Sequence, residues 1–265
     1  MKMVFLSGFA RSGTSWLLKI FAAHPEVLCH YEPFNLASQR KRLPENLRFW
    51  GALGQLRKMV EAGELEEAQR RFAKPLDRFW KVRDHALDRE PFFDQPQEGG
   101  TMVIKEDFSW IPEVVAAYGP VIQIVRDPRA LVNSLWNHTR FGRHYGAQST
   151  AERWAEANSR LLELQEKQPE RYRVVAYEEL VDRPVEMSKE LLEFAGIDWA
   201  PEVGKFLAEC HKRHDPDPYQ VYKDPKKARD GWRSKLSPAT QKLVLDAVRG
   251  SRAAKELYDD FPEGE

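Results

Sequence analysis

Residues 4–21 read VFLSGFARSGTSWLLKIF, and this stretch decides the fold. Its start, Val4–Ser7, is mostly apolar and predicts a strand that is covered on both faces. Its end, Thr14–Ala23, has the apolar spacing of a helix. The short loop between them is bracketed by Gly8 and Gly13. A strand, a glycine-bracketed loop and a helix in succession can hold phosphate oxygens, because backbone N–H groups and the positive end of the helix face the ligand.

The loop resembles a nucleoside triphosphate site but departs from it at one position. Gly8 and Gly13 have the spacing of the Walker A motif, whereas Thr14 stands where that motif has lysine. The missing lysine argues against triphosphate chemistry, because that side chain binds the β- and γ-phosphates. Arg11, inside the loop, supplies a cation instead. An ordinary tight turn would not require arginine, serine, glycine, threonine and serine in series.

The rest of the chain alternates short apolar runs with amphipathic ones. Further strands are predicted at Val27–Tyr31, Thr101–Lys105, Val121–Val125 and Tyr172–Tyr177. Further helices are predicted at Trp110–Ala117, Pro128–Phe141, Ala151–Lys167 and Ala239–Tyr258. This order predicts an α/β fold of the P-loop-containing three-layer kind, with a mainly parallel sheet of about five strands flanked by helices.

Two segments interrupt the alternation. Residues 35–100 are rich in Arg, Glu and Leu and are predicted to be a helical insertion, whose aromatic residues belong to the core or line a pocket. Residues 211–233 are dense in charged residues and proline, with little apolar periodicity, and predict a long loop. Loops of that length are often functional lids, so we expect this loop to cover a ligand. We expect residues 1–265 to form a single domain.

Composition excludes several classes of protein. Of the 265 residues, 42% are hydrophobic and 31% charged, so a disordered or fibrous chain is excluded. The chain has 41 Lys and Arg residues and 41 Asp and Glu residues, and this balance predicts no nucleic-acid partner. Any anion-binding site must therefore come from a local cluster of basic residues. No apolar run reaches the ~20 residues of a membrane span, and the chain is expected to be cytoplasmic. Two cysteines are too few for a disulfide framework. No His, Cys, Asp and Glu residues cluster at metal-ligand spacing, so no metal site is expected.

A second anion site is predicted where the strand Val121–Val125 ends. Arg126 lies at the carboxyl end of that strand, where ligands of open α/β sheets bind, and Ser134 follows about two helical turns later. An arginine and a hydroxyl can hold a phosphate through charge-assisted hydrogen bonds. Asp127 can cap the following helix, in which Pro128 suits the first position. As alternatives, Arg126 and Asp127 form a surface ion pair, or Asp127 is a magnesium ligand of the Walker B type.

These motifs resemble the sulfotransferases, which use 3′-phosphoadenosine 5′-phosphosulfate (PAPS) as sulfuryl donor. The run RSGTSW at residues 11–16 resembles their phosphosulfate-binding loop, and Arg126-Asp127-Pro128-Arg129 with Ser134 resembles their 3′-phosphate site. The resemblance is closest in style to carbohydrate enzymes and to bacterial members. It implies that the 5′-phosphosulfate is held by Arg11, Ser12, Gly13, Thr14 and Ser15.

Two further segments support the resemblance more loosely. Tyr177 begins a run similar to the family's Tyr-Glu-Asp-Leu segment, which implies a contact with adenine; a tyrosine that only caps the core is the alternative. Residues 226–233 resemble the family's late basic Gly-Trp segment, with shortened spacing. The resemblance implies that Trp232 belongs to the donor site and that Arg229, or next Lys227, contacts the 3′-phosphate; a solvated basic loop is the alternative. The helix segment at Ala151–Trp154 resembles one common in bacterial members and is expected to be structural.

The acceptor hydroxyl requires a general base, and two strand ends could supply it. Glu32 lies in a Tyr-Glu-Pro segment that resembles the carbohydrate enzymes, which implies that it is the base. Lys105 matches a catalytic lysine of the phenol and steroid enzymes, and Asp107 stands where those enzymes have histidine. We expect Glu32 to follow a strand next to the phosphate-loop strand and to be extended, because it precedes proline. His30 is expected to be structural.

The sequence therefore predicts a PAPS-dependent sulfotransferase whose catalytic residues are Glu32, Arg11 and Lys105. Its acceptor is a small-molecule or glycan hydroxyl, with a sugar favoured by the resemblance. The alternatives are a small-molecule kinase that uses Mg-ATP and a sulfotransferase-like binding module without turnover. The oligomeric state and the identity of the acceptor are left open.

Overall fold

The computed structural model describes residues 2–32, 47–73, 100–138, 146–210, 212 and 225–258. Five parallel strands form one sheet in the order β2-β3-β1-β4-β5. The strands are β1 (Lys2–Ser7), β2 (Val27–Tyr31), β3 (Thr101–Lys105), β4 (Val121–Val125) and β5 (Tyr172–Ala176). The predicted α/β class and the predicted parallel sheet are confirmed.

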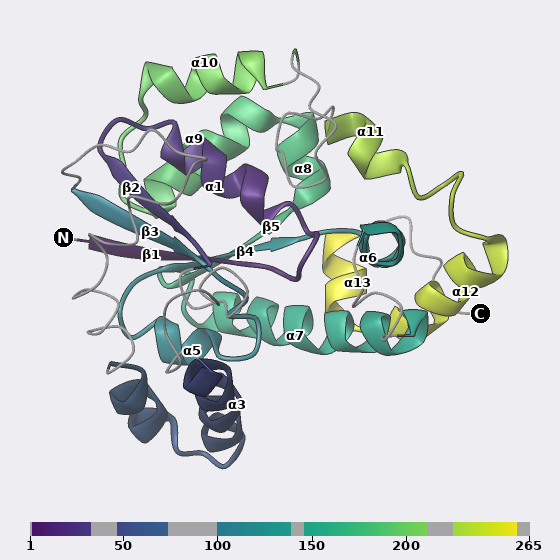
Figure 1. Ribbon diagram of the computed structural model, residues 1–265, viewed down its shortest axis with the longest axis horizontal. Helices are drawn as coiled ribbons and strands as arrows, with labels where there is room; N and C mark the ends of the chain where they lie inside the picture. Colours follow the sequence, from purple (N-terminus) through teal and green to yellow (C-terminus); the bar gives the residue numbers. More distant parts are fainter. Residues whose placement is uncertain are drawn as a thin grey trace.

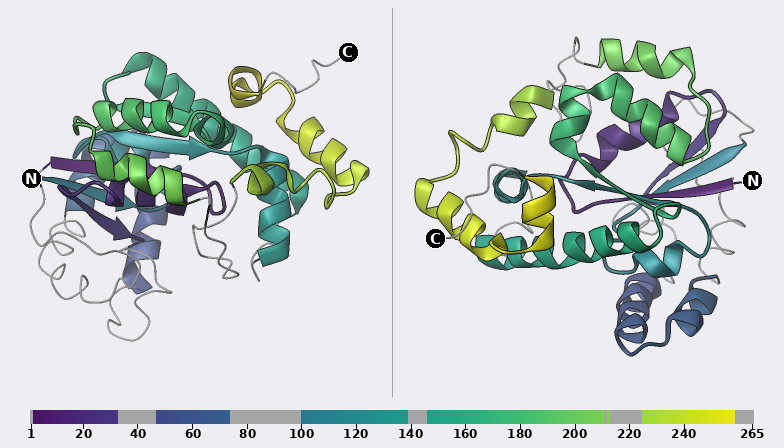
Figure 2. Two further views of the ribbon diagram at one scale, coloured as in Figure 1. Left: turned by 90° about the horizontal axis from the view of Figure 1, so that it is seen from above. Right: turned by 180° about the vertical axis from the view of Figure 1, so that it is seen from behind.

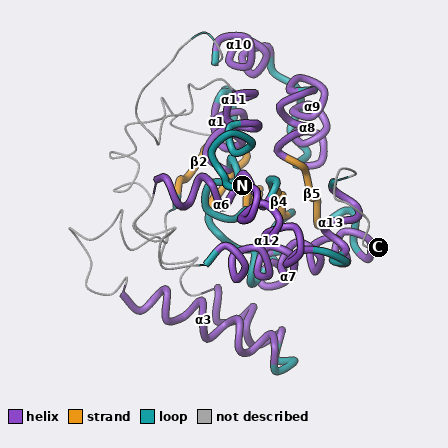
Figure 3. Tube along the Cα trace, turned by 90° about the vertical axis from the view of Figure 1, so that its right-hand side faces the viewer, coloured by secondary structure: helices purple, strands orange, loops and turns teal. Residues whose placement is uncertain are grey.

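Helices cover both faces of the sheet (Figure 1). One face is covered by α1 (Thr14–Ala22), α8 (Tyr177–Asp182), α9 (Pro184–Phe194) and α10 (Pro201–Glu209). The opposite face is covered by α5 (Pro112–Val115) and α7 (Ala147–Lys167). The view along the sheet shows the strands between these two layers (Figure 3). Because both faces are covered, β3 and β4 are buried along their whole length.

The segment between β2 and β3 is helical where the structure describes it. Helix α3 (Leu47–Glu61) and a second helix over residues 65–73 pack beneath α5 (Figure 1). Leu56 and Phe72 from these helices join Met102 of β3 in one buried cluster, so Phe72 belongs to the core. The side chains of Phe49 and Trp50, together with Phe79 and Trp80, lie outside the described residues.

A third group of helices lies beyond the carboxyl ends of the strands (Figures 1 and 2). It consists of α6 (Pro128–His138), α11 (Pro225–Asp230), α12 (Pro238–Val248) and α13 (Arg252–Leu257). The predicted single helix over 239–258 is two helices, because Gly250 adopts φ +78° and Ser251 caps α13 by accepting from Ala254 N. The part of the predicted loop 211–233 that spans 225–230 is helical, and it begins at a proline.

The strand order places the phosphate-binding candidates together. The chain leaves β1 toward β2 and β3 on one side and reaches β4 and β5 on the other, so the switch point lies at the carboxyl end of β1. The expectation that β2 lies beside β1 is wrong, because β3 lies between them and pairs with both. Glu32 is consequently next to the end of β3 rather than next to the phosphate loop.

Candidate functional site

The loop between β1 and α1 is shaped by its two glycines. A Cβ atom at Gly8 would lie 2.7 Å from the carbonyl oxygen of Ile124, so the loop can pass this close to β4 only with glycine. Gly13 adopts φ +97°, and a Cβ there would lie 2.6 Å from the ring of Tyr177. Thr14 then begins α1, with Trp16 N and Leu17 N donating to the carbonyl of Gly13. Both glycines are therefore required by close packing.

Arg11 joins the two predicted anion sites. Its backbone has φ +78°, a left-handed conformation that costs a non-glycine residue roughly 1–2 kcal/mol. Its Nε donates to Ser134 Oγ at 3.1 Å, and its carbonyl oxygen accepts from Arg126 Nη1 at 2.9 Å. The loop after β1 and the loop after β4 thus form one continuous cationic surface.

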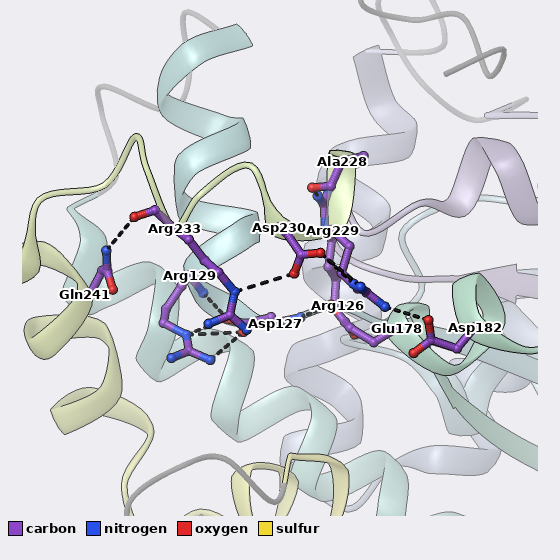
Figure 4. A network of polar contacts seen from close by, with 10 residues as sticks. All are labelled: Arg126, Asp127, Arg129, Glu178, Asp182, Ala228, Arg229, Asp230, Arg233 and Gln241. Carbon is purple, nitrogen blue, oxygen red and sulfur yellow. Dashed lines mark hydrogen bonds and ion pairs between the residues drawn. The ribbon is translucent and has the colours of Figure 1, made fainter. Parts of the chain in front are cut away.

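Among the described residues, backbone carbonyls and an aromatic ring hold Arg126, and no carboxylate pairs with it. Its Nη2 donates to the carbonyl of Ala228 in α11 (Figure 4). Its guanidinium lies 4.8 Å from the ring centroid of Tyr177. Its Nε is buried and has no hydrogen-bond partner among the described residues, and the same holds for Ser12 Oγ in the phosphate loop. Buried polar atoms without partners are unfavourable, so these two atoms suit a ligand that accepts hydrogen bonds.

Asp127 is engaged in the scaffold. Its Oδ1 accepts from Arg129 N at 2.8 Å, which caps α6, and its Oδ2 accepts from Arg129 Nη2 at 2.7 Å (Figure 4). Its backbone N–H donates to Glu178 Oε1 at 3.2 Å. With both carboxylate oxygens bonded to a buried arginine, Asp127 is not poised to bind magnesium. The surface ion-pair alternative fails as well, because Asp127 pairs with Arg129 and Arg126 does not pair with it.

The predicted catalytic lysine and glutamate form one ion pair. Lys105 Nζ is paired with Glu32 Oε1, and it lies 4.5 Å from the ring centroid of Tyr31. Burial alone would lower the pKa of the Lys105 ammonium, but Tyr31, Glu32 and Glu106 together raise it, so the ammonium stays charged. Glu32 adopts φ +44°, so the expectation of an extended Glu32 is wrong. This second left-handed residue lies beside the site, where stored strain tends to occur.

Two more carboxyl groups follow Lys105. Glu106 is buried, and burial raises its pKa to about 8, against the opposing effect of Lys105. Asp107 accepts from Ser109 N at 3.2 Å; desolvation raises the pKa of Asp107, while the hydrogen bonds from Ser109 and the charges of Lys105 and Arg153 oppose the rise. The adjacent ends of β2 and β3 therefore place one ammonium among three carboxyl groups, those of Glu32, Glu106 and Asp107.

Of the remaining predicted residues, Tyr177 contacts Arg126, whereas Trp232, Arg229 and Ser15 contact other residues. Tyr177 is buried, packing edge-to-face on Trp16 with its ring centroid 5.8 Å away. Trp232 is buried beneath the Arg129 guanidinium, which lies 4.1 Å from its ring centroid. Arg229 is paired with Asp182 at 2.6 Å and with Asp230 at 3.0 Å (Figure 4). Ser15 Oγ lies 3.5 Å from the Tyr31 hydroxyl, which connects the phosphate loop to the Glu32 side.

Sequence reasoning missed three residues of this region. Glu106, which is buried, and Glu178, which is partly buried, lie beside predicted residues, but their burial depends on how distant helices pack, and no motif indicates it. Trp154 donates from Nε1 to the carbonyl oxygen of Arg126 at 2.9 Å. The similarity of the segment 151–154 to bacterial sulfotransferases was the only signal for that contact.

No helix in the described ranges is long and apolar enough to cross a membrane. Nor do the described His, Cys, Asp and Glu residues form a group of three that could hold a metal ion.

Comparison with known proteins decides the family. Residues 4–201 match the family model described as "Sulfotransferase family". The chain belongs to the sulfotransferase family. The match spans the phosphate loop, Lys105, Arg126 and Tyr177, so the sequence prediction of a sulfotransferase is confirmed. A search of curated proteins finds no significant match.

Solved structures similar to this chain include retinol dehydratase and a sulfotransferase domain. Retinol dehydratase in complex with androsterone and PAP, the inactive cofactor, matches with a TM-score of 0.52 at 13% identity, over 94% of this chain and 80% of that chain. Retinol dehydratase with retinol and PAP matches with a TM-score of 0.51 at 13% identity, over 95% of this chain and 83% of that chain. The sulfotransferase domain of the Synechococcus PCC 7002 olefin synthase has a TM-score of 0.49 at 20% identity, over 92% and 93%. The first two similarities confirm the fold class.

Proposed function

We propose that this sulfotransferase moves the sulfuryl group of PAPS to an acceptor hydroxyl by in-line displacement. The proposal rests on the hydrogen bonds that connect the two anion sites. The Arg11 side chain donates to Ser134 Oγ, and the Arg11 carbonyl accepts from Arg126 Nη1. A single nucleotide with phosphate groups at both its 5′ and 3′ positions suits two contiguous cationic sites. PAPS has this arrangement, whereas ATP lacks the 3′-phosphate.

The residues present fit such a donor. Ser12 Oγ and Arg126 Nε are buried donors without partners among the described residues, one in each anion site. The phosphate loop would hold the 5′-phosphosulfate through Arg11, Ser12, Gly13, Thr14 and Ser15, and Arg126 with Ser134 would hold the 3′-phosphate. Tyr177 packs on Arg126, and Trp232 packs on the neighbouring Arg129. Together with Arg229, which follows the Ala228 that bonds Arg126, they would complete this end of the site. Bound PAPS supplies the activated sulfuryl group.

The proton of the acceptor hydroxyl would go to Glu32. Its carboxylate is partly exposed, with 21% of the side chain accessible, and the hydroxyl of the preceding residue, Tyr31, lies 3.5 Å from Ser15 Oγ. Lys105 would stabilise the negative charge that develops on the leaving phosphate, since its ammonium is buried and stays charged. Asp107 is the alternative base, but its Oδ1 already accepts from Ser109 N.

A sugar hydroxyl is the proposed acceptor class. The Tyr31-Glu32 segment resembles carbohydrate sulfotransferases, and this resemblance supports the sugar. The molecules bound in the retinol dehydratase structures, androsterone and retinol, support a small-molecule acceptor more generally. We further propose that residues 1–265 act as one domain and that the segment 211–233 covers the donor.

Calorimetric titration with PAP, the 3′,5′-bisphosphate product, and with Mg-ATP tests the donor. We expect tight binding of PAP and weak binding of Mg-ATP; the reverse result would favour the kinase alternative. Transfer of labelled sulfuryl groups from PAPS to a panel of sugars, phenols and lipid alcohols tests turnover and acceptor class. Tight PAP binding with no transfer to any member would favour the binding module without turnover.

A further inference from the structure

A chain of buried polar side chains runs through the layer between the sheet and α7. Gln123, in the middle of β4, donates from Nε2 to Ser109 Oγ at 3.0 Å and to Asn158 Oδ1 at 3.2 Å. Asn158, on α7, donates from Nδ2 to the carbonyl of Trp154 at 2.9 Å. All of these side chains are at most 1% exposed.

The two ends of this chain reach both halves of the site. At one end, Trp154 Nε1 donates to the carbonyl oxygen of Arg126 at 2.9 Å. At the other end, Ser109 is part of the turn that bonds Asp107, and Ser7 Oγ, at the end of β1, accepts from Phe108 N at 2.9 Å. Hydrogen bonds through the protein interior therefore connect the turn after β3, the strand before the phosphate loop and the turn after β4.

The stability of the fold does not by itself explain why these buried side chains are polar. Buried amides and hydroxyls lose their bonds to water, and apolar residues of similar size at such positions are often as stable. A fully bonded polar chain instead fixes one arrangement of the elements that it joins, because any shift leaves a buried group without its partner. The elements joined here carry Arg126 and Asp107.

We propose that Trp154 and Asn158 are positioning residues that hold Arg126 at the correct place for the 3′-phosphate. The Trp154 indole donates to the backbone carbonyl of Arg126 and so fixes its backbone. The Arg126 guanidinium donates to the carbonyls of Arg11 and Ala228. Asn158 fixes α7 against β4 and thereby fixes the indole of Trp154. This inference rests on the proposed function, since it assigns the 3′-phosphate to Arg126.

The test measures the preference for PAP over AMP, which lacks the 3′-phosphate, by calorimetric titration of the full chain. Trp154→Phe keeps an aromatic ring and removes the N–H that bonds Arg126. We expect this variant to lose about three- to tenfold of the preference, the effect of one hydrogen bond, with AMP affinity unchanged. Asn158→Leu, which breaks the chain one residue away, is the second variant and should lower the preference in the same direction.

Leu162→Ala is the matched control, because Leu162 is buried on the same helix and in the same apolar cluster as Trp154 without being part of the polar chain. It should lower the melting temperature more than Trp154→Phe while keeping the preference for PAP. An unchanged preference in Trp154→Phe and Asn158→Leu, or an equal loss in Leu162→Ala, would overturn the inference. A wild-type protein that does not prefer PAP over AMP would instead contradict the proposed donor, and the inference with it.

Discussion

Lys105 Nζ and Glu32 Oε1 form an ion pair between neighbouring strands, at the edge of the sheet where the phosphate loop opens. A carboxylate that neutralises an ammonium is a weaker base than a free one, because protonating it would leave the charge of Lys105 uncompensated. A donor phosphate that attracts Lys105 would relieve this restraint. Binding of the donor would then prepare Glu32 to accept the proton of the acceptor.

Replacing Glu32 tests its role as general base. Glu32→Gln keeps a hydrogen-bond acceptor for Lys105 and removes the basic oxygen, so we expect the transfer rate to fall by about 10²–10⁴ while PAP affinity barely changes. The measurement is the rate of labelled sulfuryl transfer to the best acceptor, with PAP binding by calorimetry. Asp107→Asn is the matched control and should lose less. Near-wild-type transfer by Glu32→Gln, with transfer abolished in Asp107→Asn, would place the base at the end of β3.

The 3′-phosphate assignment is tested at Arg126 and Ser134. Arg126→Ala should weaken PAP binding by about tenfold or more, because a lost hydrogen bond to a charged group is worth ~1.5–3 kcal/mol. Adenosine 5′-phosphosulfate, which has no 3′-phosphate, should bind the variant nearly as well as the wild type. Ser134→Ala should act in the same direction with a smaller effect. Arg171→Ala, at the opposite end of β5 from Tyr177, is the control; equal weakening of both ligands in Arg126→Ala would refute the assignment.

Glu106 makes stability depend on pH. Burial raises the pKa of Glu106 from 4.5 to about 8, so the native protein holds a proton that the unfolded chain releases. This stabilising contribution is fully present below pH 4.5 and is lost as the pH rises through about 8, with a slope of at most about 1.4 kcal/mol per pH unit. Glu106→Gln lacks the titrating group, so its stability relative to the wild type should increase between pH 5 and 8.

Urea unfolding at pH 5, 6.5 and 8 measures this difference. Glu152→Gln, at an exposed position on α7, is the control and should track the wild type across the range. A constant difference between Glu106→Gln and the wild type would mean that the carboxyl group of Glu106 does not retain its proton in the folded protein.

Local signals were sufficient to predict the strands and to mark the two loops that are candidates for anion binding. Val27–Tyr31, Thr101–Lys105 and Val121–Val125 are continuous β-prone runs, and their bounds agree with the structure. The loop at Gly8–Thr14 and the arginine after β4 have fixed spacings that are independent of distant residues. Gly250 and Ser251 are also local signals, and they separate α12 from α13. The sequence prediction of one helix over 239–258 ran across them.

Pairings between distant segments could not be predicted in the same way. The long segment between β2 and β3 gives no indication that β3 inserts between β2 and β1, so the Lys105–Glu32 contact did not follow from the sequence. The burial of Glu106, and the hydrogen bond from Trp154 to Arg126, depend on how the elements pack. The bond of Arg229 to Asp182 depends on α11 lying against α8, which the charged sequence of 226–233 does not indicate.

Arg229 provides a test of the segment expected to cover the donor. Its guanidinium is paired with Asp182 and Asp230, whereas the proposed function directs it to the 3′-phosphate. Removing the arginine and removing one of its acidic partners should therefore have opposite effects. We expect Arg229→Ala to weaken PAP binding, and Asp182→Asn to strengthen it by at most about fivefold, since exposed ion pairs contribute little.

Hydrogen exchange measures directly whether PAP protects the backbone amides of residues 226–233. Amides of residues 226–233 should become more protected when PAP is added to the wild type, and less so in Arg229→Ala. Arg233→Ala is the matched control, because Arg233 contacts Asp230 from a more exposed position and has no assigned phosphate contact. If Arg229→Ala binds PAP as the wild type does and exchange in 226–233 is unchanged by PAP, then α11 is a fixed part of the scaffold. The 3′-phosphate would in that case be bound by Arg126 and Ser134 without Arg229.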